Sequence, residues 1–168
     1  MVCVETGKDN HLKPLSLSAV YSAANSKAQP IIKSDTSVAS HDTVSLVVEF
    51  QHCSEIFIST GGVHSVALCE KKDIVTFKED ISRNNALDKL FGECILKDIP
   101  MKDRMVVTSC RISSEILLKV AKRNIPILIS KSAPTNLAVS FAAETGITLI
   151  GFVRAKRMNV YANEWRVI

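Results

Sequence analysis

The sequence predicts an α/β domain whose sheet carries helices on both faces. Along most of the chain, short apolar segments of strand length alternate with segments whose apolar residues recur at helical spacing. The strand segments, such as MVVTSC (105–110) and IPILISKS (125–132), are almost continuously apolar, which is typical of strands buried on both faces. A length of 168 residues with 46% hydrophobic side chains is enough for one such domain.

The N-terminal part of the chain does not share this pattern. Residues 1–41 contain seven serines and no sustained apolar period, so we expect a poorly defined N-terminal segment followed by an α/β domain at 42–168. From residue 42 the apolar side chains fall at helical spacing, and Asp42 is placed to cap the helix. The residues on this apolar face are Leu46, Val47, Phe50, Cys53 and Phe57.

The remaining elements follow in order. HSVALC (64–69) and IVTF (74–77), joined by a polar turn, predict a β-hairpin, and a helix with an apolar face begins at about Arg83. Thr135 is placed to cap a later helix and Gly146 to end it. Beyond the Arg83 helix the sequence predicts strand 105–110, helix 113–124, strand 125–132, helix 135–146, strand 147–153 and a short last strand, 158–162.

Composition excludes several classes of protein. No apolar run reaches the roughly 18 to 20 residues of a membrane span, and the start MVCVETGKDN is not a secretory signal, so we expect a cytoplasmic protein. Five scattered cysteines argue against a disulfide framework and for a reducing compartment. A net charge of +4 is too small to indicate nucleic-acid wrapping. No Cys-x-x-Cys pair or Gly-x-Ser-x-Gly elbow occurs, so neither a zinc site nor a serine hydrolase is expected.

Polar loops follow the predicted strands, and ligands of such sheets bind beyond the carboxyl ends of the strands. Helices that start at Arg83, Ser113 and Thr135 would aim free N–H groups at one edge of the sheet. The basic run Arg154, Lys156 and Arg157 follows another strand at the same edge. Together these features predict a site for an anionic, nucleotide-like ligand.

Each feature taken singly also has an ordinary structural explanation. Gly61-Gly62 is a common turn, and His64 could be a surface or core histidine. Polar residues at helix starts serve as caps, and a basic run can form a solvated turn. Only their combination favours a binding site.

Three long motifs, in this order, resemble the formate dehydrogenase accessory sulfurtransferase family, known as FdhD. They are TGGVHSVAL (60–68), EDISRNNALDKLFGE (79–93) and the run from SCRISSE to MNVY (109–161). The resemblance implies a three-layer α/β/α sandwich with a mixed sheet, similar to cytidine deaminases but without their zinc. It also implies a homodimer that passes persulfide sulfur from a cysteine desulfurase to bis-molybdopterin guanine dinucleotide before this cofactor enters formate dehydrogenase.

The resemblance also implies which residues contact the cofactor. The cofactor-contacting stretch of the family corresponds to Phe152, Val153, Arg154, Ala155, Lys156 and Arg157. Other motif positions, which we expect to line the same pocket, are Gly61, Gly62, His64, Arg83, Asn85, Arg111, Ser132 and Thr135.

The chain departs from the family pattern at several positions. Asn84 stands where members usually have histidine, and Cys110 stands where they usually have a glycine that would let the backbone approach the ligand. The Cys-x-x-Cys that bears the persulfide is absent from this chain, and Cys3 in that region is single. A truncated chain and a divergent member of the family are both compatible with this difference.

Two functions follow as hypotheses. The first is a sulfur carrier for the molybdenum cofactor, and the second is a non-catalytic chaperone module that holds the nucleotide end of the cofactor. A nucleoside deaminase is excluded because Ser65 and Val66 follow His64, where a His-x-Glu motif is required. Cys53 and Cys94, on apolar helix faces, are predicted to be core residues.

Overall fold

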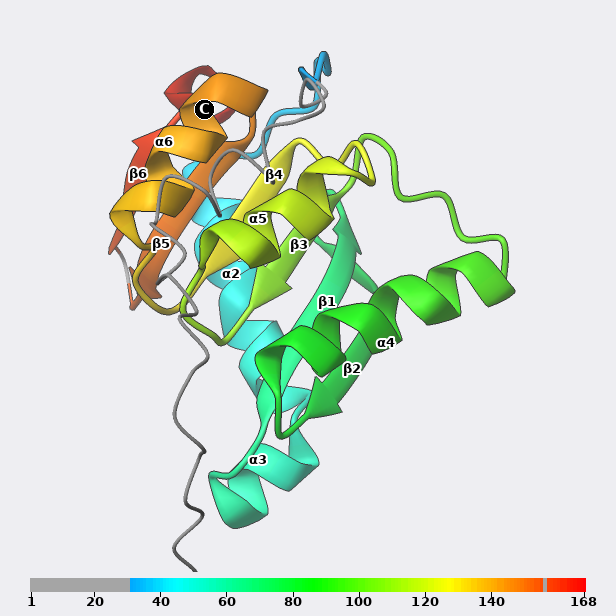
Figure 1. Cartoon of the computed structure of the whole chain (residues 1–168). Coiled ribbons are helices and arrows are strands. Elements are labelled where there is room, and N and C mark those ends of the chain that lie inside the picture. The colour runs from blue at the N-terminus through cyan, green and yellow to red at the C-terminus, as the bar shows by residue number, and fades with distance from the viewer. Residues whose placement is uncertain (1–30, 156) are drawn as a thin grey trace, which may run out of the picture.

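The computed structural model describes residues 31–155 and 157–168, and the predicted alternation of strands and helices is confirmed there (Figure 1). The helices are α2 (Ser40–His52), α3 (Glu55–Thr60), α4 (Arg83–Leu96), α5 (Ser114–Ala121), α6 (Asn136–Thr145) and the 3₁₀ helix η1 (Glu164–Arg166). The strands are β1 (His64–Glu70), β2 (Asp73–Asp80), β3 (Met105–Thr108), β4 (Ile127–Ser130), β5 (Thr148–Arg154) and β6 (Arg157–Ala162).

The strands form one six-stranded mixed sheet in the order β2-β1-β3-β4-β5-β6. The central strands β3, β4 and β5 are parallel to one another. The hairpin β1–β2 joins β3 through an antiparallel pairing of β1, and β6 pairs antiparallel with β5. The predicted hairpin and the predicted mixed sheet are therefore both present.

Helices cover both faces of this sheet, which confirms the predicted three-layer α/β/α arrangement. Helices α4, α5 and α6 lie on one face and α2 on the other (Figure 1). Alternate strand residues divide between the two cores: Val106 packs with α4, α5 and α6, whereas Val107 packs with α2. Cys94 lies in the first of these cores, as predicted.

Residues 31–39 also pack onto the domain. The Ile32 N–H donates to the carbonyl of Thr145 at 2.8 Å, and Val38 forms a parallel bridge with Val167. Arg166, only 4% exposed, donates to the carbonyl of Gly146 at 2.8 Å and is therefore a structural residue of the core. The prediction for residues 1–30 lies outside the described residues.

The prediction of one long helix from Asp42 through Phe57 is wrong in the extent of the helix and in the residue that caps it. Helix α2 ends at His52, and the Ser54 side chain accepts a hydrogen bond from the Phe57 N–H at 3.2 Å, which starts the separate helix α3. Cys53 is consequently exposed rather than in the core, and Phe57 is 47% exposed. The N-cap of α2 is Ala39, which makes no side-chain hydrogen bond to the helix. Asp42 lies within the first turn and does not cap the helix.

No helix in the described ranges, 31–155 and 157–168, has both the length and the apolar composition required to cross a membrane.

Candidate functional site

The strand ends bring several loops to one edge of the sheet. Thr108, the last residue of β3, pairs with Ser130, the last residue of β4, and with Val66 near the start of the antiparallel β1. Lys131 and Ser109 extend these ladders by one residue, since their N–H groups donate to the carbonyls of Thr108 and Ser65. The loops after β3 and β4 and the turn before β1 therefore meet at this edge, as ligand loops do in α/β sheets.

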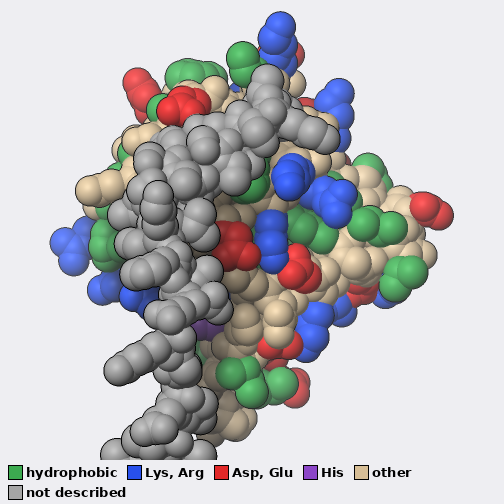
Figure 2. Space-filling model, viewed as in Figure 1, with side chains coloured by type: hydrophobic (Ala, Val, Ile, Leu, Met, Phe, Trp, Pro, Cys, Tyr) green, Lys and Arg blue, Asp and Glu red, His purple; other side chains and the backbone are tan. Residues whose placement is uncertain are grey.

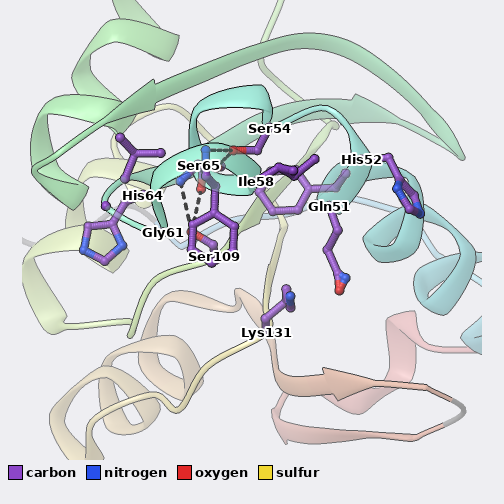
Figure 3. Close-up of a pocket in the computed structure, with 13 residues that line it drawn as sticks. Gln51, His52, Ser54, Ile58, Gly61, His64, Ser65, Ser109 and Lys131 are labelled. Carbon is purple, nitrogen blue, oxygen red and sulfur yellow. Dashed lines mark hydrogen bonds between the residues drawn. The ribbon is translucent and has the colours of Figure 1, made fainter.

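A pocket of about 690 Å³ opens at this edge, on the face of the sheet that α2 covers (Figure 3). Helix α2 and the following turn supply one wall, and the glycine turn before β1 supplies another. The lining consists of Phe50, Gln51, His52, Ser54, Phe57, Ile58, Gly61, Gly62, Val63, His64, Ser65, Ser109 and Lys131.

Hydroxyl groups form the floor of the pocket. The Ser65 N–H donates to Ser109 Oγ at 2.9 Å, and Ser65 Oγ lies 3.3 Å from Ser54 Oγ. The hydroxyls of Ser54 and Ser65 both donate to one carboxylate oxygen of Glu79 on β2. Ser54 and Ser65 are each only 3% exposed, so this network fixes the orientation of the floor.

Positive charge enters this pocket from the loop after β4. Lys131 is half-buried, and burial together with the positive charge of Arg154 lowers its pKa. The Arg154 guanidinium lies 5.7 Å from the centroid of the exposed Phe152 ring. Among the described residues neither Lys131 nor Arg154 has a carboxylate within salt-bridge distance. The positive charges of Lys131 and Arg154 are therefore available to bind an anion, since no carboxylate of the described residues pairs with them.

Close contact with the β4–α6 loop fixes the position of the β5–β6 hairpin. The Phe152 N–H donates to the carbonyl of Ser132 at 3.2 Å. A Cβ atom added at Gly151 would lie 3.0 Å from the Ser132 carbonyl oxygen and 3.1 Å from Pro134 Cδ, so a larger residue would require these neighbours to shift. Phe152 itself has a φ of +53°, next to an irregularity in the β5–β6 pairing. Its ring is thus held at the strand end beside Arg154.

Two further basic side chains act on His64 electrostatically. Burial is the largest cause that lowers the pKa of His64, and the positive charges of Arg83 and Arg111 lower it further. Arg83 opens α4 and Arg111 follows β3. In Figure 3 His64 and Lys131 stand apart, with Ser109 drawn between them.

The structure places the other predicted residues around these two groups. Ser132 supports the hairpin through its carbonyl, and Thr135 caps α6 by accepting a hydrogen bond from the Ala138 N–H at 3.2 Å. Asn85 lies exposed in the first turn of α4. Of the predicted residues that the structure describes, only Gly61, Gly62 and His64 line the pocket itself. Within the predicted basic stretch, Val153 is buried, Phe152, Arg154, Ala155 and Arg157 are exposed, and Lys156 lies outside the described residues.

Cys110 does not narrow the pocket. Its side chain is 3% exposed, its sulfur lies 3.0 Å from Thr108 Oγ1, and it is not among the lining residues. Burial raises the pKa of Cys110 and raises that of Cys69 to about 12. Cys53 is the exposed cysteine in the described ranges, and burial and Glu49 raise its pKa as well. A persulfide carrier needs a thiolate, which these shifts disfavour.

Sequence reasoning missed Lys131 and the hydroxyl floor. The loop KSAPT had been expected to contribute Ser132 and Thr135, yet the strand alternation that places Ile127 and Ile129 toward α2 places Lys131 on the same face. Counting this period-two pattern one residue beyond the strand would have indicated Lys131. Ser54 carries no such signal, because its place depends on the break between α2 and α3.

The fold and the site define a class: an α/β/α protein with a hydroxyl-lined, cationic pocket at the carboxyl edge of its parallel strands. The FdhD/NarQ family model matches residues 15–168, and the chain belongs to this family. It is 44% identical over 142 residues to the sulfur carrier protein FdhD of Geobacillus kaustophilus, covering 84% of this chain and 54% of that protein. It is 48% identical over 124 residues to the protein of the same name from Bacillus subtilis, covering 74% and 47%.

A solved structure supports the same assignment. The crystal structure from Desulfotalea psychrophila described as a formate dehydrogenase accessory protein superposes with a TM-score of 0.76 at 29% identity. The match covers 83% of this chain and 59% of that one. The chain spans about half the length of the curated relatives named above.

Proposed function

We propose that this chain binds the guanine nucleotide end of a molybdopterin dinucleotide as cargo, in the service of sulfur delivery for formate dehydrogenase. The observation that carries the proposal is the pocket at the strand ends, with Lys131 and Arg154 beside it and no carboxylate paired to either among the described residues. The family relationship supplies the biological context, since the relatives are named sulfur carrier proteins.

The residues of the pocket, together with two residues of the neighbouring β5–β6 hairpin, fit such a ligand. Lys131 and Arg154 provide cationic donors for a pyrophosphate, and the exposed Phe152 ring offers a face on which a base can stack. The floor hydroxyls of Ser65 and Ser109 can exchange hydrogen bonds with sugar or base atoms. The volume of about 690 Å³ lies within the range of ordinary ligand pockets.

A sulfur carrier would be loaded in a transfer step, in which a cysteine thiolate attacks the terminal sulfur of a desulfurase persulfide. The new S–S bond forms on the carrier while the desulfurase cysteine leaves as a thiolate, so sulfur moves without net oxidation. In the described ranges Cys69, Cys94 and Cys110 are buried and the exposed Cys53 has a raised pKa. This observation favours the second candidate function, a cofactor-binding chaperone that performs no covalent chemistry with these four cysteines.

Nucleotide binding is tested by replacing two basic residues together. Arg154→Ala with Arg157→Ala should weaken GDP binding in calorimetry by tenfold or more, which corresponds to about 1.4 kcal/mol, because the cationic strand end is lost. The matched control is Lys33→Ala with Lys122→Ala, which removes the same charge from two exposed lysines that lie away from the pocket. Equal GDP affinity in the two double variants would refute the proposal.

The two candidate functions are separated by mass spectrometry. The chain is incubated with a cysteine desulfurase and cysteine, and its peptides are examined for one added sulfur atom. A persulfide on any cysteine supports the carrier function. A chain that binds GDP but gains no sulfur supports the chaperone function instead.

A further inference from the structure

We propose that Glu79 makes the floor of the pocket a hydrogen-bond acceptor, and that this floor selects a base with two adjacent N–H donors, which guanine has at N1 and at its 2-amino group. The inference deepens the proposed function and rests on it, because it names the part of the nucleotide that the floor recognises. Glu79 is not itself among the lining residues and acts through the serines in front of it, so it is a positioning residue.

Glu79 lies directly behind the floor. It is the partner of Ser65 across the β1–β2 ladder, so the two side chains stand on the same face of the sheet. One Glu79 carboxylate oxygen accepts hydrogen bonds from the Ser54 hydroxyl and, at 3.3 Å, from the Ser65 hydroxyl. Glu79 forms no salt bridge within residues 31–155 and 157–168, so no protein cation competes with these hydroxyls for its carboxylate.

The hydroxyl protons of the floor are therefore directed into the protein. A serine hydroxyl has one proton to donate and two lone pairs that accept. The Ser65 proton has two acceptors, Glu79 and Ser54 Oγ, each at 3.3 Å, and the Ser109 hydroxyl donates to the Ser65 carbonyl at 3.5 Å. Ser65 Oγ and Ser109 Oγ, which lie side by side in Figure 3, consequently offer lone pairs rather than protons to a ligand.

The backbone donors of the floor are occupied as well. The Ser65 N–H donates to Ser109 Oγ at 2.9 Å, and the Ser109 N–H donates to the Ser65 carbonyl at 3.1 Å. The Lys131 N–H donates to the Thr108 carbonyl at 3.2 Å. These hydroxyl and amide groups have no proton left for a ligand, so a ligand binds at the floor by donating its own N–H groups.

The same arrangement orients a nucleotide. Phosphate oxygens are acceptors and carry negative charge, so the serine oxygens and the Glu79 carboxylate disfavour them at the floor. Lys131 and Arg154 supply the positive charge that a phosphate requires. The base therefore meets the floor and the phosphates meet the two basic side chains. Hypoxanthine lacks the 2-amino group of guanine and would leave one floor oxygen without a partner, which is how such a site rejects an analogue.

The test compares three ligands in calorimetric titrations of the whole chain: GDP, inosine diphosphate, which lacks only the 2-amino group, and inorganic pyrophosphate. The wild-type chain should bind GDP about tenfold more tightly than inosine diphosphate. Glu79→Met removes the acceptor of the hydroxyl protons, and Ser65→Ala removes a floor oxygen. Each should reduce this preference to about twofold or less. Pyrophosphate affinity reports whether the fold and the cationic end of the site are intact.

Two further variants serve as controls. Glu79→Gln keeps an acceptor oxygen at the same place, so it should retain most of the preference for GDP. Glu144→Met makes the same change as Glu79→Met at an exposed position of α6 away from the pocket, and it should retain all of the preference. A Glu79→Gln chain that behaves like Glu79→Met would contradict the role of Glu79 as a hydrogen-bond acceptor.

The outcomes distinguish this inference from the proposed function on which it rests. Equal wild-type affinity for GDP and inosine diphosphate would overturn the inference and leave the proposed nucleotide binding standing. If Glu79→Met weakened both nucleotides equally, the floor would recognise sugar hydroxyls, and the inference would also be overturned. Loss of pyrophosphate affinity in both Glu79→Met and Ser65→Ala would assign the network a structural role instead. A wild-type chain that binds pyrophosphate but not GDP would contradict the proposed function itself.

Discussion

Lys131 brings a positive charge into a lining that otherwise consists of glycines, hydroxyl groups, histidines, one amide and apolar side chains. Burial and Arg154 both lower its pKa, because each makes the charged ammonium less favourable. An anion between Lys131 and Arg154 would offset their repulsion. The same reasoning applies at His64, where two arginines and burial act together.

The lowered pKa of His64 gives the first prediction at this scale. Arg111→Gln removes one positive charge beside the imidazole and should raise the pKa of His64 toward its ordinary value of 6.5. An NMR titration of the imidazole protons measures this shift, with Lys122→Gln as the control. The charged groups that lower the pKa of His64 are Arg83 and Arg111, and its ladder partner is Asp80. An unchanged pKa in Arg111→Gln would contradict the proximity of the two side chains.

The same shift determines the pH dependence of stability. Because the folded pKa lies below that of the unfolded chain, the neutral imidazole contributes stability that is present above about pH 6.5. This contribution is lost as the pH falls from 6.5 through the folded pKa.

Among the elements, the β5–β6 hairpin determines where Phe152 and Arg154 lie relative to the pocket. Its place depends on Gly151, whose missing side chain lets the Ser132 carbonyl and the Tyr161 ring approach to 3.0 Å of the Cβ position. Phe152 and Arg154 follow directly, so a shift of the strand at Gly151 moves both side chains. Tyr161 belongs to β6, and the contact therefore also holds the hairpin partner.

Gly151→Ala should consequently reduce both stability and GDP affinity. The added methyl group meets a backbone carbonyl that cannot rotate away, and overpacking of this kind costs roughly 1–3 kcal/mol of unfolding free energy. Thermal or urea unfolding measures the loss, and calorimetry measures GDP affinity. Gly92→Ala is the matched control, since it lies inside α4 with nothing within 4 Å of its Cβ position and should raise stability by about 0.5–1 kcal/mol. Equal effects of the two substitutions would contradict the account.

Sequence patterns predicted the elements from β1 to β6 because each has a clear period and a marked end, such as Thr135 and Gly146 around α6. The break between α2 and α3 was missed, because the apolar spacing continues through Phe57 although Ser54 starts a new helix. Helix α3 has no buried residue, and its apolar Ile56, Phe57 and Ile58 are exposed. The spacing of apolar residues shows which side of a helix is apolar. It does not show whether another element packs against that side.

The site was predicted less completely than the fold. Strand ends and basic loops indicated the correct sheet edge for Gly61, Gly62 and His64. They did not indicate Lys131, because its place in the pocket depends on the strand order and on which face of the sheet α2 covers. The contribution of each remaining predicted residue to binding stays a prediction.

At the scale of the whole molecule, the order β2-β1-β3-β4-β5-β6 is what assembles the site. It sets the start of the antiparallel β1 beside the ends of the parallel β3, β4 and β5, so residues far apart in sequence share one edge. Figure 2 shows that basic and acidic side chains are interspersed over the face that carries α4 and α5. The local lack of paired carboxylates at the strand ends, rather than a large net charge of the chain, therefore favours anion binding there.

The central claim is that a guanine nucleotide binds at this edge, and amide NMR spectra of the labelled chain titrated with GDP test it most directly. We predict that the largest shifts fall on amides of the glycine turn, the strand ends and the hairpin, with added salt reducing the affinity. These amides are Gly61, Gly62, Ser65, Ser109, Lys131, Phe152 and Arg154. Shifts confined to the opposite edge, around Gly146, Thr148 and Arg166, or no shift at all, would contradict the account.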